Sequence, residues 1–106
     1  MSISYYILMS KFVLKFLWLE KAIAVGLDQK IADRTSPVTE YFFWPRKDAW
    51  EEMKLDLETK PWITNAESIL LLNQVTEVIN FWQENNALDL AKVRSRFPEC
   101  LFIGYS

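Results

Sequence analysis

An aromatic ring followed closely by cations is the feature of this sequence with the clearest chemical use. In the stretch EYFFWPRKDAW, residues 40–50, Trp44 precedes Pro45, and Arg46 and Lys47 come next. A flat ring beside fixed cations can stack an unpaired base while the cations hold its phosphates, and such a stack is worth about 1–3 kcal/mol. The alternative is that Trp44 belongs to the core and that both cations are only solvated.

Further candidate cations occur in three places: near the start of the chain, in a polar stretch between residues 28 and 37, and close to the C-terminus. If these groups shared one face of the fold, they would form a basic patch for a polyanion. The alternative for the polar stretch is that its cations serve solubility. The candidate contacts to nucleic acid are Lys11, Lys15, Lys30, Arg34, Trp44, Arg46, Lys47, Lys92, Arg94 and Arg96.

The sequence lacks the residues that most enzyme sites use. It contains no histidine, one cysteine and two glycines. A single cysteine without histidine makes a zinc site or an activated thiol improbable, and two glycines exclude Walker-type and dinucleotide-binding loops. Carboxylates such as Glu51 fall near the start of an expected helix, where they complement the helix dipole. We therefore expect no enzyme activity, no metal, no cofactor and no small-molecule substrate.

Charge is distributed unevenly along the 106 residues, although the net charge is only −2. Residues 1–47 carry seven Lys and Arg against four Asp and Glu, residues 48–90 two against nine, and residues 91–106 three against one. The basic ends could contact a polyanion while the acidic middle faces elsewhere.

No stretch reaches the ~20 apolar residues that span a bilayer, so we expect no membrane partner. A lone cysteine fits a reducing compartment.

Alternating patterns predict three strands in the first half of the chain. Residues 12–20 and 22–27 alternate in the way that predicts a β-hairpin, and the second of them has small residues on one face, which leaves room for a packed helix. The polar residues 28–37 predict a loop. Residues 38–44 predict a strand with apolar groups on both faces, which Pro45 ends.

Helical periodicity begins after Pro45. A helix of about three turns should end before Pro61, and a second, of about twenty residues, should begin at a capping box formed by Thr64 and Glu67 and end at Asn85–Asn86. A short third helix then precedes Pro98, and a last strand follows from Cys100 to Tyr105. The order β-β-β-α-α-α-β predicts an α+β fold, a small antiparallel sheet with helices packed on one face.

Four blocks of the sequence resemble a known family. They are KFVLKFLWLEKAIAVGLDQ (residues 11–29), TSPVTEYFFWPRKDAWE (residues 35–51), KPWI (residues 60–63) and TEVINFWQE (residues 76–84). In this order they resemble the plastid-specific ribosomal protein three family, which has chloroplast and cyanobacterial members. The resemblance covers about residues 9–104. We expect residues 1–8 to be an N-terminal extension and residues 9–106 to form a single ribosomal-protein domain.

The resemblance implies a non-catalytic constituent of the small (30S) subunit of plastid-type ribosomes. Its expected partners are 16S rRNA and neighbouring small-subunit proteins, and its expected location is the plastid stroma, or the cytoplasm if the source is a cyanobacterium. The net charge of −2 departs from that of most ribosomal proteins, which are basic. The alternative is a non-enzymatic adaptor or ribosome assembly factor. A moderate-salt wash separates the two, because a constituent stays with the subunit and a transient factor does not.

Overall fold

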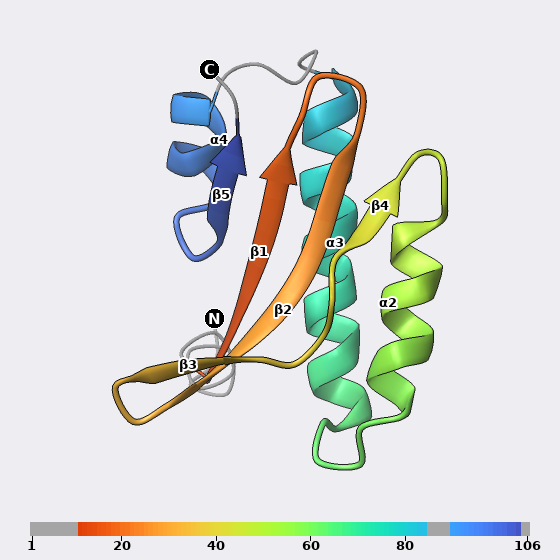
Figure 1. Cartoon of the computed structure of the whole chain (residues 1–106), viewed down its shortest axis with the longest axis vertical. Helices are drawn as coiled ribbons and strands as arrows, with labels where there is room; N and C mark the ends of the chain where they lie inside the picture. Colours follow the sequence, from red (N-terminus) through yellow and green to blue (C-terminus); the bar gives the residue numbers. More distant parts are fainter. Residues whose placement is uncertain (1–10, 85–89, 105–106) are drawn as a thin grey trace.

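The computed structural model describes residues 11–84 and 90–104 and shows an α+β fold in which helices cover one face of a sheet (Figure 1). This fold class was predicted and is confirmed. The predictions for residues 1–8 and for the break at Asn85–Asn86 lie outside the described residues. The elements are β1 (Phe12–Trp18), β2 (Ile23–Ile31), β3 (Arg34–Pro37), β4 (Phe42–Trp44), α2 (Ala49–Glu58), α3 (Asn65–Glu84), α4 (Leu90–Arg96) and β5 (Leu101–Gly104).

The predicted hairpin of β1 and β2 forms the centre of the sheet. Phe12 pairs with Gln29 at one end and Trp18 with Ile23 at the other, in antiparallel register. Phe12, Leu14, Phe16 and Trp18 of β1 point to the helices, because alternation puts these four residues on one face. They and their partners on β2 are almost completely buried, namely Phe12, Leu14, Phe16, Trp18, Ile23, Val25 and Leu27.

The outer edge of β2 is shared by β3 and β4, and Thr39 joins the two parts. Val38 and Thr39 both donate their amides to the Leu27 carbonyl, at 2.8 and 3.2 Å. The Leu27 amide in turn donates to Thr39 Oγ1 at 3.0 Å, so the buried hydroxyl replaces a backbone acceptor where the chain passes from β3 towards β4. This side chain fixes the point from which Tyr41 and β4 continue.

The prediction of a loop over residues 28–37 is wrong. β2 continues to Ile31, turns at Ala32 and Asp33, and returns as β3, with Ile31 opposite Arg34 and Asp28 opposite Pro37. Backbone hydrogen bonds hold this hairpin, and its exposed side chains carry no hydrophobic alternation that the sequence could reveal. The strand expected over residues 38–44 is correspondingly short, covering only Phe42–Trp44.

The last strand, β5, gives the sheet one parallel pair, where an antiparallel sheet was expected. β5 follows β1 with Phe16 opposite Phe102 and Trp18 opposite Gly104. The chain reaches β5 through α4, whose Val93 is buried, as is Phe97 directly after it, and such a helical crossover is what a parallel connection requires. Rings from β1, α3 and β5 form one cluster with the ring of Phe97, which follows α4; the members are Phe16, Trp18, Phe81, Phe97 and Phe102.

The helices begin and pack as their sequences dictate. Asp48 accepts the Glu51 amide at 3.0 Å and caps α2. The predicted capping box of α3 is confirmed, because the Glu67 amide donates to Thr64 Oγ1 at 3.1 Å and the Thr64 amide donates to Glu67 Oε1 at 2.8 Å. The apolar stripes of the two helices then pack on the sheet, through Met53, Leu57, Leu71, Val75, Val78 and Trp82.

Candidate nucleic-acid interface

Strand β4 presents three consecutive aromatic rings in different environments. Trp44 lies opposite Ile23 and packs, half-buried, against the core, and Phe42 is buried. Phe43 lies opposite Ala24, on the face of the sheet that the helices leave uncovered, and is 42% exposed. Trp44 thus packs against the core, as the alternative interpretation had it. The ring that is open to a ligand is that of Phe43.

The segment between β4 and α2 holds the two predicted cations at the surface. Pro45 follows Trp44 through a cis peptide bond, and α2 begins only at Ala49, after its Asp48 cap. Arg46 and Lys47 are exposed, and neither makes a hydrogen bond or an ion pair with the part of the chain that the structure describes. Both cations are therefore available to an external anion.

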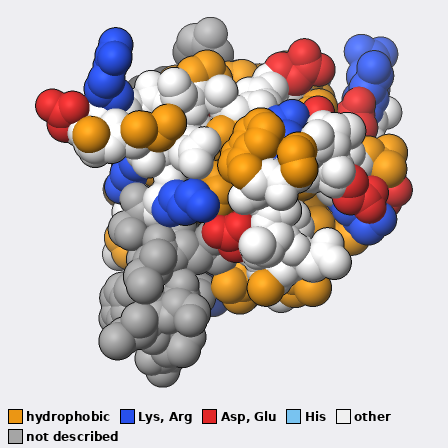
Figure 2. All heavy atoms as spheres, turned by 90° about the horizontal axis from the view of Figure 1, so that it is seen from below, with side chains coloured by type: hydrophobic (Ala, Val, Ile, Leu, Met, Phe, Trp, Pro, Cys, Tyr) orange, Lys and Arg blue, Asp and Glu red, His pale blue; other side chains and the backbone are white. Residues whose placement is uncertain are grey.

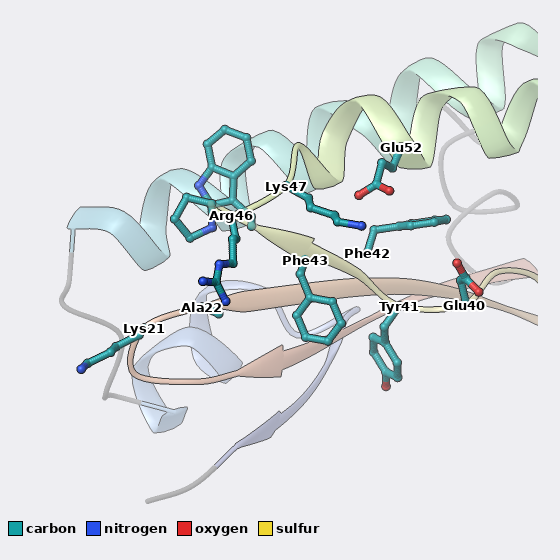
Figure 3. A pocket seen from close by; sticks show the side chains of 11 residues that line it. Lys21, Ala22, Glu40, Tyr41, Phe42, Phe43, Arg46, Lys47 and Glu52 are labelled. Carbon is teal, nitrogen blue, oxygen red and sulfur yellow. The ribbon is translucent and has the colours of Figure 1, made fainter.

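A hollow of about 800 Å³ lies beside β4, and the close view of it shows how its groups are arranged (Figure 3). Lys21, from the turn between β1 and β2, and Arg46 lie at one end. Glu40 lies at the other end, and the rings of Tyr41 and Phe43 lie between. We call this hollow the β4 pocket; its lining residues are Lys21, Ala22, Glu40, Tyr41, Phe42, Phe43, Trp44, Pro45, Arg46, Lys47 and Glu52.

The arrangement of the β4 pocket suits an unpaired nucleotide. An exposed ring provides a stacking surface, and the cations beside it can bind the phosphates of the same strand. Three cations and two carboxylates line the pocket, so its net charge is only slightly positive. The positive potential is confined to the end where Lys21 and Arg46 lie. Binding there would depend on the arrangement of charges and not on a basic surface as a whole.

Two of the candidate cations are paired within the fold. Lys15 Nζ lies 2.6 Å from Asp28 Oδ1, with side chains 17% and 13% exposed, and 5.2 Å from the centre of the Tyr41 ring. Lys11 Nζ lies 3.6 Å from Glu67 Oε2, and its side chain is more exposed. Lys15 is therefore used mainly to hold the sheet face together, whereas Lys11 keeps part of its surface free.

The remaining candidates lie away from the β4 pocket. Lys30 and Arg34 are exposed near the tip of the β2–β3 hairpin, and the cations of α4 lie at the β5 edge, opposite to the edge that carries β4. Seen from below, Lys and Arg side chains are dispersed among acidic and hydrophobic groups (Figure 2). The predicted clusters thus do not merge into one patch.

The α4 cations contact neighbouring groups of the fold. Arg94 Nη2 donates to the Phe102 carbonyl at 2.9 Å, which satisfies an acceptor of the edge strand β5. Lys92 and Arg96 lie over the rings of Phe81 and Phe97, at 5.9 and 5.4 Å. These contacts make Arg94 in particular a structural residue as well as a candidate contact.

Sequence reasoning missed Lys21 and Phe43. Lys21 is 25 positions from Arg46, and only the pairing of β2 with β4 brings the β1–β2 turn to the pocket. Phe43 belongs to a strand with aromatic residues on both faces, so alternation separated its two faces without showing which one the helices cover. The signal needed was the pairing of residues 23–25 with residues 42–44, which the sequence alone does not display.

Cys100 is buried, and burial together with the neighbouring Glu99 raises the pKa of its thiol to about 12. The nucleophilic form of cysteine is the thiolate, so this thiol should be unreactive. We expect iodoacetamide at pH 8 to leave Cys100 unmodified in the native chain and to modify it fully in urea. Equal labelling rates in the two states, followed by mass spectrometry, would show that the thiol is accessible and reactive.

Within residues 11–84 and 90–104, no three His, Cys, Asp or Glu side chains gather as a metal site. Among the helices of these ranges, none combines the length and the hydropathy of a membrane-spanning segment.

Comparison with known proteins assigns the chain to a family. Residues 38–85, which include β4, α2 and α3, match the family described as plastid and cyanobacterial ribosomal protein (PSRP-3/Ycf65). Small ribosomal subunit protein cS23 of Euglena stellata is 61% identical over 92% of this chain and 99% of its own length. The cS23 protein of Mesostigma viride is 59% identical over 89% of this chain and 77% of its own length.

A cyanobacterial relative extends the comparison beyond plastids. The probable small ribosomal subunit protein cS23 of a Synechococcus strain is 48% identical over 91% of this chain and 98% of its own length. Each of these matches covers about nine-tenths of the chain, well beyond residues 38–85. The chain therefore belongs to the plastid and cyanobacterial ribosomal protein family PSRP-3/Ycf65.

Proposed function

We propose that this chain is a structural constituent of the small subunit of plastid-type ribosomes and that it contacts 16S rRNA through the β4 pocket. As a family member it works in a plastid, or in the cytoplasm of a cyanobacterium. The role is non-catalytic: it positions RNA and neighbouring proteins. The observation that carries the RNA contact is the exposed Phe43 ring beside Arg46 and Lys21.

The acidic total charge makes a local RNA contact more reasonable than a broad one. Phosphates near α2 and α3 would meet carboxylates, since residues 48–84 carry eight Asp and Glu against two Lys. The β4 pocket instead offers exposed cations that no group of the described chain neutralises by an ion pair. We therefore expect one or a few unpaired nucleotides to enter this pocket, with the rest of the contact made by backbone phosphates.

A Phe43→Ala variant tests the stacking contact. Loss of one stacked base should weaken binding roughly tenfold, since such a stack is worth about 1–3 kcal/mol. We expect small subunits carrying the variant to lose the protein during a moderate-salt wash. A few unpaired 16S rRNA nucleotides should also become reactive to chemical probes.

The matched control is Ile103→Ala, which removes an exposed apolar side chain from β5 at the opposite edge of the sheet. This control should leave retention and RNA reactivity unchanged. Retention of Phe43→Ala at the wild-type level, with unchanged RNA reactivity, would contradict the stacking contact. If the wild-type chain itself were removed by the wash, or were found only on precursor particles, the assembly-factor alternative would replace the proposal.

A further inference from the structure

An exposed tryptophan lies on the turn between α2 and α3, at the opposite end of α2 from β4 (Figure 1). Trp62 is 51% exposed, whereas the next residue, Ile63, is buried in the core. The Ile63 amide donates to the Lys60 carbonyl at 3.1 Å, and the Lys60 amide donates to the Leu57 carbonyl at 3.1 Å. With Pro61 restricting the backbone between them, these bonds fix the backbone of the turn from which the exposed indole projects.

Apolar groups continue from this turn onto α3. Ile69 is 58% exposed, and together with Pro61 it lines a hollow of about 310 Å³ between the end of α2 and the start of α3. The capping box directly after the turn fixes the start of α3, so the backbone of the turn and the first turn of the helix keep their relative position. We call Pro61, Trp62 and Ile69 the α2–α3 patch. Rigid aromatic and aliphatic anchors of this kind are typical of protein interfaces.

The charges around the α2–α3 patch oppose binding of RNA. Each lysine that the described chain places beside it already has a carboxylate partner. The pairs are Lys54–Glu58 at 3.7 Å, Lys60–Asp56 at 3.2 Å and Lys11–Glu67 at 3.6 Å. The excess charge on α2 and α3 is negative, so a phosphate strand would be repelled and a basic protein segment attracted.

We propose that the α2–α3 patch binds a basic segment of a neighbouring protein in the small subunit, with apolar side chains of that segment packed on Trp62 and Ile69. In Figure 2, which views the molecule from the end where the α2–α3 turn lies, hydrophobic groups gather in the middle of the face with both acidic and basic groups beside them. Charge complementarity selects the partner, and the anchors supply the binding energy. This inference depends on the chain being a subunit constituent, but not on the RNA contact of the β4 pocket.

Site-specific photocrosslinking tests the partner directly. The full-length chain with benzoylphenylalanine in place of Trp62 is incorporated into small subunits, which are washed in moderate salt and irradiated. We expect a covalent link to a protein peptide in which Lys and Arg outnumber Asp and Glu. A link to rRNA, a link to an acidic or neutral peptide, or no link above the unirradiated control would each overturn the proposal.

Two substitutions provide an independent readout. Trp62→Ser removes an apolar anchor, and Glu58→Lys reverses a charge beside the patch. Each should lower the amount of the chain that stays on the small subunit after the wash at least threefold. The matched controls are Leu101→Ser on β5 and Glu77→Lys, which lies on a different face of α3, beside α4; both should be retained. Wild-type retention of Trp62→Ser and Glu58→Lys would overturn the inference. Circular dichroism melting of each free variant shows that it is folded.

The outcomes of the two proposals are distinguishable. If Phe43→Ala is retained and Trp62→Ser is lost, the RNA contact fails and the protein contact stands. If Trp62→Ser is retained and Phe43→Ala is lost, only the α2–α3 patch has been assigned wrongly. If the wild-type chain is absent from washed subunits, both proposals fail together.

Discussion

Replacing Asp28 with alanine should lower the free energy of unfolding by about 2–3 kcal/mol, because the Lys15 ammonium then lacks its counter-charge in a largely buried position. The two charged atoms are 2.6 Å apart, and the hydrogen bonds of the described chain give Asp28 Oδ1 no other partner. Because both side chains keep some exposure, we expect less than the full effect of breaking a completely buried pair. Urea denaturation should show a lower midpoint at an unchanged m-value.

The control for this prediction removes both charges. A Lys15→Met, Asp28→Ala double variant leaves no isolated charge, and we expect it to recover most of the stability lost by Asp28→Ala alone. If Asp28→Ala changed the stability by less than about 0.5 kcal/mol, the pair would behave as an ordinary surface ion pair. Lys15 could then be reconsidered as an RNA contact.

The surroundings of Lys15 explain why this pair matters to the fold. Lys15 lies opposite Gly26, and a Cβ at that position would lie 2.9 Å from Lys15 Cε. The lysine stem therefore occupies the space that the glycine leaves, under the Tyr41 ring. The small residues of β2 were expected to make room for helices. They make room instead for a charged side chain on the helix-free face.

Local chemistry explains what the sequence could predict. In β1 and in α3 the apolar residues repeat regularly over the whole length of the element, every second residue in the strand and on one face of the helix. Burial follows this repeat because one face of each element must leave water. The capping box is equally local, since Thr64 and Glu67 need only each other's amides. The class of the fold follows from such elements and their order.

Pairings between distant segments were beyond the same reasoning. β3 is held by backbone hydrogen bonds to β2, which any polar side chain permits, so the residues from Asp28 to Pro37 resembled a loop. The direction of β5 depends on how α4 returns the chain, and no property of Leu101–Gly104 encodes it. Both errors concern sheet edges, where side-chain burial gives little information.

The candidate site was only half predictable for a related reason. Arg46 and Lys47 follow a strand that Pro45 ends, and their exposure could be inferred from that position. Which aromatic ring accompanies them depends on which face of β4 the helices cover, and this is decided by the packing of Trp44 with the core. Phe43 became the open ring as a consequence.

The largest functional effect is expected from reversing Arg46 and Lys47, the two cations of the β4 pocket that follow Pro45. A chain with Arg46→Glu and Lys47→Glu should bind the small subunit about 10–100-fold more weakly, because two phosphate contacts become repulsive. The free domain should stay folded, since both side chains are exposed and a carboxylate close to the start of α2 favours the helix dipole. Sedimentation across a salt series measures the affinity, and circular dichroism the fold.

The salt series also decides whether the effect is local. Each phosphate contact contributes about 0.7–0.9 to the slope of log affinity against log salt, so the double variant should lower this slope by about 1.4–1.8. Reversing Lys30 and Arg34 changes the net charge equally at the hairpin tip, remote from the β4 pocket. If both double variants lost the same affinity, long-range charge would explain the loss and the assignment of the pocket would be wrong. If the Arg46, Lys47 variant unfolded, these cations would be structural.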